Sequence, residues 1–427
     1  MILIYKNPEQ YFYSIENAYS ELIEKDAEKV AEVLNIIPAL LVQFSYEDEK
    51  FYSSLAMHYS EGYNEATGTV WESLLDTVVK MKPVFVENHY TGEQEIIIQD
   101  ANDYLYLINN TGRILWKKKL EGSIMGIIFQ VDYYKNGKLQ YLFNTQKAIH
   151  LIDRNGNYVE RYPVMLSSNA TNGMALFDYD NRGDYRIFHA AEDKRIYVHN
   201  LEGNLVTGWT FDKTEGIVKS PIQHFRVGTK DYIVLKDNIR TYILNRRGEE
   251  RVTLKEQFSA SENNIYYLDM NVEEDNPMLV TSDKEGSIWS VDFSGNVKTV
   301  FSNKTKENHY FIYEDIDNDG AADYIFTDEN VLKVFNSNGK RLFSFKIKSD
   351  ISTMPDIYQF SSSIIKIGIT DIIEDEIYLL NADGSVYNGF PIAGSSRFTI
   401  GMLNGSEDRF NLIVGNSDSF LYNYSVD

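Results

Sequence analysis

The chain has 427 residues, 43% of them hydrophobic and 14% aromatic, with only 8 prolines, which is the composition of a folded protein rather than a disordered one. Its 41 basic and 63 acidic residues give a net charge of −22, which disfavours nucleic acid and anionic lipid as partners. Because there is no cysteine, a disulfide framework, a thiolate metal site and a cysteine nucleophile are excluded. The 31 tyrosines and 23 phenylalanines favour β structure, since amphipathic rings suit a sheet that is wet on one side.

The N-terminal residues MILIYKNPEQ lack the basic and apolar regions of a signal peptide. No apolar run approaches about 18 residues, so we expect no transmembrane segment in this chain. The alternation of Ile2 to Tyr5 is typical of the end of a strand. This leaves open that Met1 begins a fragment, with a signal or an anchor upstream of it.

Residues 1–66 differ from the rest of the chain and predict a small α+β segment. Residues 8–34, PEQYFYSIENAYSELIEKDAEKVAEVL, carry apolar side chains at helical spacing and fit one or two amphipathic helices. Residues 39–60, ALLVQFSYEDEKFYSSLAMHYS, alternate on both sides of the polar Glu47 to Lys50 and predict a β-hairpin. The segment either docks on the rest of the chain or is the remnant of a larger domain, and we favour the remnant.

The next stretch, TGTVWESLLD from Thr67 to Asp76, matches a later one, TGRILWKKKLEG from Thr111 to Gly122. Both contain a Trp, a Leu four residues after it, and an acidic residue after that Leu. The later copy ends a run of predicted strands, whereas the earlier copy begins one. We therefore interpret Thr67 to Asp76 as the last strand of a repeat, placed in the sequence before the first complete repeat.

A repeat of about 45 residues organises the chain from there on. An alternating apolar run ends in Asn or Asp, two further residues and Gly, as in LYLINNTG and IHLIDRNG. The Asx side chain and a left-handed Gly together form a type I turn with a bulge between antiparallel strands. The glycines recur every 44 to 47 residues, at Gly112, Gly156, Gly203, Gly248, Gly295, Gly339 and Gly384, and the Asx residues at Asn109, Asp153, Asn200, Asn245, Asp292, Asn336 and Asn381.

Each period holds four strand-sized runs, for example MALFDYD, YRIFHAA, RIYVHNL and NLVTGWTF from Met174 onward. Four short antiparallel strands per 40 to 50 residues are typical of a β-propeller blade. Seven complete blades are predicted from about Pro83 to Ile392. The fold class is therefore mainly β, an eight-bladed β-propeller over residues 67–427.

The eighth blade is predicted to be mixed. The last copy supplies FTIGMLNGSED, FNLIVGNSD and FLYNYSVD but no fourth strand. Residues 69–76 match a fourth strand, so we expect them to pair with Phe420 to Val426 and close the ring. Such closure removes the edges that an open array of sheets would expose.

The sequence DIDNDGAAD predicts a cation site. Oxygen ligands at alternate positions, a Gly for the sharp turn and a further acid form a loop typical for Ca²⁺, as in propellers with FG-GAP-like repeats, which this loop resembles. Because Phe326 stands where an EF-hand requires Glu, that motif is excluded. We expect one structural Ca²⁺ between the first two strands of blade 6, the alternative being an acidic turn without metal. Its predicted ligands are Asp315, Asp317, Asp319, the Ala321 carbonyl and Asp323.

Two equivalent loops are incomplete copies. DYDNRGDYR keeps Asp178, Asp180 and Gly183 but has Arg182 at the position of the third ligand, where we expect the guanidinium to replace the cation. DYYKNGKLQ keeps Asp132 and Asn136 before its Gly. Only the blade 6 loop is therefore predicted to bind metal.

The phrase LYLINNTGRILWKKKL resembles the PQQ-like repeat, an apolar strand, Asp, two residues, Thr-Gly and an aliphatic run ending in Trp. The Trp is kept at Trp71, Trp116 and Trp209, so the resemblance covers mainly the strand turn. That family includes eight-bladed quinoprotein dehydrogenases and the lipoprotein of the outer-membrane barrel-assembly machinery. The dehydrogenases stack their cofactor on a vicinal disulfide, which a chain without cysteine cannot form, so no PQQ is expected.

Taken whole, the chain resembles a set of uncharacterised exported Bacteroidetes proteins that carry a domain of unknown function. The resemblance implies a periplasmic or cell-envelope location and no known activity. Two functions remain open. We expect a non-catalytic binding or scaffolding propeller whose partner is a protein or a polysaccharide, and the alternative is a hydrolase or lyase with its site at the central channel.

Catalytic signatures are sparse. The histidines fall singly in strands and loops, without the HxH, HExxH or GxSxG patterns of metal or nucleophile sites, and we expect them to be structural. They are His58, His89, His150, His189, His199, His224 and His309. An enzyme should have a deep polar pocket at the channel mouth, whereas a scaffold should have a channel filled by side chains and an exposed aromatic patch elsewhere.

Overall fold

The computed structural model describes residues 2–5, 39–47, 50–58, 68–270, 276–403 and 409–426. The chain divides into two compact units, residues 1–68 and 69–427. The first contains an antiparallel sheet of three strands, β1 (Ile2–Tyr5), β2 (Ala39–Glu47) and β3 (Lys50–His58). The β2–β3 hairpin, in which Glu47 pairs with Lys50, confirms the hairpin predicted from the alternation. The helices predicted over residues 8–34 lie outside the described residues.

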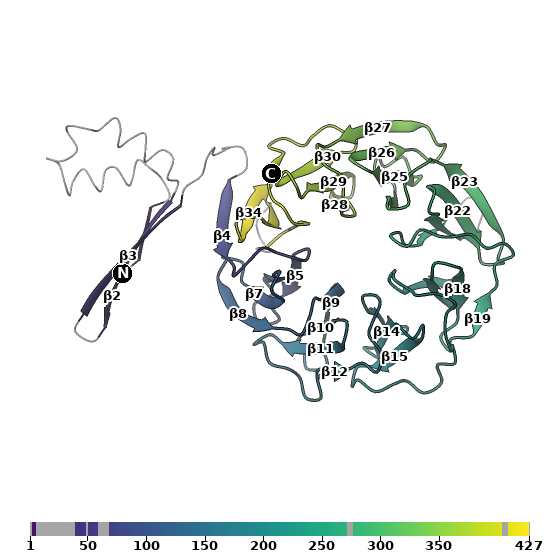
Figure 1. The fold of residues 1–427 in the computed structure, drawn as a ribbon, viewed down its shortest axis with the longest axis horizontal. Coiled ribbons are helices and arrows are strands. Elements are labelled where there is room, and N and C mark those ends of the chain that lie inside the picture. The colour runs from purple at the N-terminus through teal and green to yellow at the C-terminus, as the bar shows by residue number, and fades with distance from the viewer. Residues whose placement is uncertain are drawn as a thin grey trace. The chain divides into compact units, whose positions relative to one another are not determined.

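The described part of the second unit is a ring of eight antiparallel sheets, the blades of a β-propeller (Figure 1). The strands of blades 1 to 3 are β5 (Val84–Glu87), β6 (Gln94–Gln99), β7 (Tyr104–Ile108), β8 (Ile114–Lys119), β9 (Met125–Val131), β10 (Gln140–Asn144), β11 (Ala148–Asp153), β12 (Val164–Met165), β13 (Ala175–Phe177), β14 (Arg186–Ala190) and β15 (Ile196–Asn200). The strands of blades 4 to 6 are β16 (Gln223–Val227), β17 (Lys230–Lys236), β18 (Thr241–Leu244), β19 (Glu250–Val252), β20 (Tyr267–Asp269), β21 (Met278–Ser282), β22 (Ser287–Asp292), β23 (Val297–Ser302), β24 (Tyr310–Glu314), β25 (Asp323–Asp328), β26 (Val331–Phe335) and β27 (Arg341–Lys346).

Blade 7 contains β28 (Asp356–Ser361), β29 (Ile364–Asp371), β30 (Glu376–Asn381) and β31 (Ile392–Ala393), and blade 8 contains β32 (Thr399–Gly401), β33 (Phe410–Gly415), β34 (Phe420–Val426) and β4 (Thr69–Leu74). In blade 8 the order is β32–β33–β34–β4, and Phe420 pairs with Leu74 while Asn423 pairs with Trp71. The mixed blade is therefore confirmed, and Figure 1 shows β4 beside β34.

The hydrophobic core lies between blades rather than inside one sheet, because neighbouring blades stack face to face. Middle strands such as β6 and β10 are almost completely buried, as expected for strands covered on both faces. The outer strand β8 instead alternates half-buried and exposed residues. Each blade thus needs both neighbours, and closing the ring covers the last open face.

The repeated turns have the predicted geometry and a second role. In each, the Gly N–H donates to the Asx carbonyl three residues earlier, as in the 3.0 Å bond from Gly112 to Asn109, and the Gly has φ between 76° and 84°. A side chain of the preceding blade packs on the glycine: a Cβ at Gly112 would lie 2.8 Å from the Trp71 ring, and one at Gly156 would lie 3.0 Å from the Trp116 ring. The glycines therefore also make room for contacts between blades.

The prediction of four strands in every blade is wrong for blade 3. Its sheet has three strands, because NLVTGWTF does not form a fourth. Only an isolated bridge between His199 and Leu205 continues the sheet. The Trp209 indole N–H donates to the Ile196 carbonyl at 3.0 Å, so a side chain takes a hydrogen-bonding position that a fourth strand would use. The rim of blade 3 is left without an outer strand.

Candidate metal centre

The acidic loop of blade 6 connects β24 to β25 and is held by its first carboxylate. Asp315 accepts hydrogen bonds from the N–H of Asp319 at 3.2 Å and of Gly320 at 2.9 Å. Asn318 and Gly320 have φ of 58° and 92°, so the backbone turns sharply through the left-handed region. These bonds bring the side chains before and after the turn to the same place.

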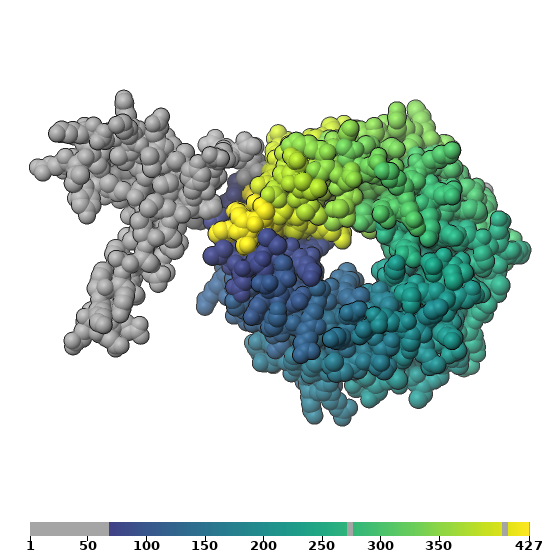
Figure 2. Space-filling view, viewed as in Figure 1, coloured from purple at the N-terminus to yellow at the C-terminus, as the bar shows by residue number. Residues whose placement is uncertain are grey.

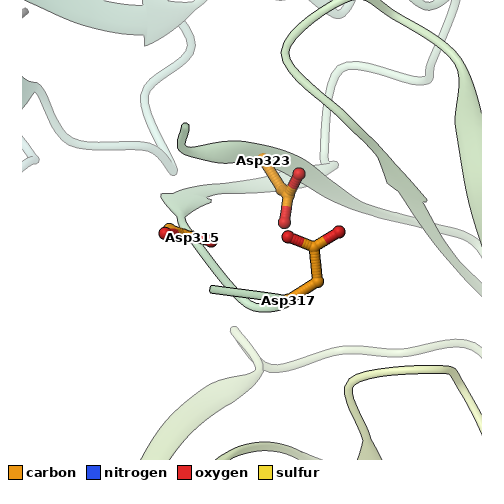
Figure 3. A group of neighbouring side chains, drawn as sticks. All are labelled: Asp315, Asp317 and Asp323. Atoms are coloured by element: carbon orange, nitrogen blue, oxygen red, sulfur yellow. The ribbon is translucent and has the colours of Figure 1, made fainter. Parts of the chain in front are cut away.

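Three carboxylates meet there. Asp315, Asp317 and Asp323 each offer an oxygen atom, and these atoms lie within 4.8 Å of one another. Figure 3 shows the carboxylates of Asp317 and Asp323 facing each other. Carboxylate oxygens are the kind of hard ligand that Ca²⁺ takes.

Asp323 is the decisive member of the group. The residue is 1% exposed, and its Oδ2 accepts the Ile316 N–H at 3.1 Å. Its Oδ1 is buried and has no hydrogen-bond partner. Burial, followed by the neighbouring charges of Asp317 and Asp315, raises the pKa of Asp323 to about 7. A carboxyl group buried in this way is stabilised either by a cation beside its ionised form or by taking up a proton.

The remaining predicted ligands are placed differently. Asp319 is not one of the three, and its Oδ1 accepts the Ala321 N–H at 2.9 Å. The contributions of Asp319 and of the Ala321 carbonyl to a cation shell stay predictions.

The loops of blades 2 and 3 show that this backbone forms without the metal ligands. Asp132 accepts the Asn136 N–H at 3.0 Å and the Gly137 N–H at 2.7 Å, as Asp315 does in blade 6. At the position of Asp323, blade 2 has Gln140, whose Oε1 accepts the Tyr133 N–H at 2.8 Å. A neutral amide there makes the same backbone bond, so the blade 6 loop gathers negative charge that the blade 2 loop lacks.

In blade 3 an arginine does approach the loop, but not the one expected. Arg246, from the β18–β19 turn of blade 4, pairs with Asp180 at 3.1 Å and with Asp231 at 2.6 Å. Arg182 donates only its backbone N–H, to Asp178 at 3.1 Å. The guanidinium that neutralises this loop therefore comes from the next blade, and the prediction for Arg182 is wrong.

Several of the described histidines are held by hydrogen bonds within the fold. His150 lies between Thr145 and Tyr158, at 3.1 and 2.9 Å, and His309 bonds Ser282 at 3.0 Å. Burial lowers the pKa of His150 to about 4. Burial, together with the neighbouring His199, lowers the pKa of His189 to about 3. His58 lies in β3, where only the backbone is described.

The centre of the ring is open, as the space-filling view shows (Figure 2). The filled channel that would have favoured a scaffold over an enzyme is therefore not seen in this view. A cavity of about 400 Å³ lies elsewhere, between blades 3 and 4, and is lined by the Asp178–Arg186 loop, residues 206–209 and the turn at Arg246 and Arg247. This cavity was not predicted from the sequence, although Trp209 and the arginine pair in TYILNRRG signalled it.

The comparisons with known proteins give the fold. Among solved structures, BamB from Moraxella catarrhalis aligns with 84% of this chain and 100% of its own, at 13% identity and a TM-score of 0.52. Quinohemoprotein alcohol dehydrogenase from Comamonas testosteroni aligns with 84% of this chain and 76% of its own, at 9% identity and a TM-score of 0.54. The Dos1 propeller aligns with 84% of this chain and 95% of its own, at 13% identity and a TM-score of 0.50.

The chain is an eight-bladed β-propeller similar to these proteins. No protein-family model and no curated protein sequence matches it. Among the described residues, no helix is long and apolar enough to cross a membrane. At these sequence identities the similarity establishes the fold alone, so function has to be argued from the chain's own residues.

Proposed function

We propose that the chain is a non-catalytic binding propeller with a protein partner, located in the bacterial cell envelope. The proposal is carried by the chemistry of the cavity between blades 3 and 4. Its side chains are aspartate, arginine, tyrosine, threonine and apolar residues, without histidine, lysine, serine or glutamate. Asp178 holds the loop backbone, and Asp180 and Asp184 are paired with arginines. No lining carboxylate is therefore free to act as a general base, whereas a cavity with an apolar floor and polar groups fixed by their partners suits binding.

The envelope location is supported by the resemblance to exported Bacteroidetes proteins and to the repeat family that includes an outer-membrane lipoprotein. The fold similarity to BamB agrees with it. A polysaccharide partner is the second form of the proposal. It is less well supported, because the lining carboxylates, which would accept hydrogen bonds from sugar hydroxyls, are already bonded within the chain.

Site-specific cross-linking tests the binding function. Thr207 lies at the cavity and is exposed, and replacing it with benzoylphenylalanine should cross-link one reproducible protein in cells that make this chain. Thr111, an exposed residue in the turn of blade 1, is the control position. If neither position gives a cross-linked partner and the purified chain turns over a substrate, the proposal is overturned in favour of an enzyme.

We also propose that the blade 6 loop binds one structural Ca²⁺ through Asp315, Asp317 and Asp323, with Asp319 and the Ala321 carbonyl completing the shell. The support is the buried Asp323 Oδ1 without a partner, aimed at two further carboxylates. Calcium would relieve the repulsion within the cluster and bind only the folded loop. It should stabilise the fold by about 2.7 kcal/mol at a hundredfold excess over its Kd.

Thermal melting of chelator-treated protein measures this effect. Asp317→Asn should abolish the rise in melting temperature with calcium. Asp180→Asn changes the equivalent position of blade 3, where Arg246 already supplies the positive charge, and should keep the rise. If calcium up to millimolar concentration gives neither heat nor a melting shift in the unchanged protein, the loop is an acidic turn.

A further inference from the structure

The cavity between blades 3 and 4 exists because blade 3 has no fourth strand. Its apolar lining is Phe188 of β14, Val198 of β15, and Val206 and Trp209 of the segment that replaces the strand. Trp209 is fixed by its bond to the Ile196 carbonyl and by an edge-to-face contact with Phe188, at 5.2 Å between ring centroids and 87° between planes. The floor is therefore a rigid apolar surface.

Four arginines surround this floor, and they are of two kinds. Arg186 is paired with Asp184 through two bonds, of 2.7 and 3.1 Å. Arg246 is paired with Asp180 and also lies over the Tyr179 ring, 4.5 Å from its centroid. These two arginines are occupied by partners within the chain.

Arg182 and Arg247 are arginines of the second kind, without such partners. Both line the cavity and are exposed, and their guanidinium groups form no ion pair or hydrogen bond with the described residues. In a chain with a net charge of −22, two unpaired guanidinium groups beside the apolar floor of the cavity are a local reversal of charge. Guanidinium pairs with carboxylate through two parallel hydrogen bonds, which neither water nor a neutral group reproduces.

We propose that this cavity binds a protein segment that presents a carboxylate next to an apolar side chain. The apolar side chain would lie on Trp209 and Val198, and the carboxylate would pair with Arg182 and Arg247. This proposal rests on the binding function proposed above and names the chemistry of the partner. A uronic acid would satisfy the arginines equally well, but its hydroxyls would lie on the apolar floor with the cavity's carboxylates already occupied.

The segment carries one or two acidic residues rather than a long acidic run. The long-range field of the chain repels polyanions, whereas a single carboxylate inside the cavity feels mainly the adjacent arginines, because the Debye length is about 8 Å at physiological ionic strength. A volume of about 400 Å³ also accommodates only a few side chains. Binding should therefore weaken with added salt but persist at physiological ionic strength.

Peptide display on the complete chain tests the proposal. Selection from a random 12-residue library should enrich sequences with Asp or Glu, or a free C-terminal carboxylate, beside an apolar residue. A synthetic peptide of the enriched sequence should bind Arg182→Gln/Arg247→Gln at least about tenfold more weakly than the unchanged chain, since charged hydrogen bonds are lost. The control is Arg113→Gln/Arg341→Gln, which removes two exposed arginines without side-chain partners among the described residues. Arg113 lies just before β8 in blade 1 and Arg341 at the start of β27 in blade 6, and this double variant should leave the affinity unchanged.

Three results would overturn the proposal. One is the absence of enrichment, another is equal loss of affinity in both double variants, and the third is selective loss of alginate oligosaccharide binding in Arg182→Gln/Arg247→Gln. The Thr207 cross-link separates this proposal from the function on which it rests. If the cross-linked partner persists in Arg182→Gln/Arg247→Gln, the recognition chemistry is wrong and the binding function stands.

Discussion

The contact between Trp71 and Gly112 joins the mixed blade to blade 1, and replacing the glycine tests whether it stabilises the ring. A Cβ at Gly112 would lie 2.8 Å from the Trp71 ring, closer than real Cβ atoms approach, and the residue has φ of 83°. The left-handed backbone should cost about 1–2 kcal/mol for alanine, and overpacking should cost about 1–3 kcal/mol more. Gly112→Ala should therefore lower the free energy of unfolding by about 2–5 kcal/mol.

Gly92 separates the two contributions. It has φ of 74° but no atom within 4 Å of an added Cβ, so Gly92→Ala should cost only the backbone part, about 1–2 kcal/mol. Urea denaturation followed by far-ultraviolet circular dichroism measures both variants. The difference between them isolates the clash with the indole.

Trp71→Ala completes a double-mutant cycle. Trp71 is only half-buried, so the cavity cost should be below the about 3–5 kcal/mol of a fully buried Trp, although its 2.8 Å bond to the Asn110 carbonyl is also lost. Without the ring there is no clash, so the double variant should be less destabilised than the sum of the single variants by about 1–3 kcal/mol. Equal costs for the two glycines, or strict additivity, would refute the proposed contact.

Three further predictions use the same denaturation assay. Lys236 is 3% exposed, and burial lowers its pKa to about 7, so between about pH 7 and 10.5 the unfolded chain binds a proton that the folded chain does not. The free energy of unfolding should therefore rise with pH in this range, by up to about 1.4 kcal/mol per pH unit relative to Lys236→Met. Profiles of equal slope against pH for the two proteins would contradict this. Burial lowers the pKa of His189 to about 3, so below pH 6.5 the unfolded chain binds a proton that the folded chain does not. The free energy of unfolding should therefore fall as the pH is lowered from 6.5 towards 3, and His189→Phe should remove this dependence. Arg154→Met should cost about 3–5 kcal/mol because it leaves Glu95, 3% exposed, without its ion pair. Adding Glu95→Gln should recover most of that loss, and no recovery would show that the buried charge is not the cause.

The ring could be predicted from the sequence because its signals are local. An Asx residue and a Gly three residues later determine a turn by their own conformational preferences, and the turn occurs seven times. The first three predicted ligands of the acidic loop are likewise neighbours in the chain. The Asp323 oxygen without a hydrogen-bond partner was not predictable, because it depends on how deeply the first residue of β25 is buried.

The features that were not predicted depend on contacts between residues that are far apart in the sequence. The pair formed by Arg246 and Asp180 spans 66 positions, so neither residue signals the other in the sequence. The missing fourth strand of blade 3 follows from where the Trp209 indole binds, whereas its alternating sequence is typical of a strand. The same displacement opens the cavity, so the structure deviates from the repeat at the site proposed for the partner.

The pairing of β4 with β34 also has a consequence during synthesis. A ribosome makes Leu74 early and its partner Phe420 late, so β4 waits unpaired while the blades between them are made. At about 5–20 residues per second the wait lasts roughly 17–70 s. Over that time β4 is an exposed edge strand, with Val70 and Leu74 still 45% and 61% exposed in the closed ring. Nascent chains of this protein should therefore be substrates for chaperones until the final blade emerges.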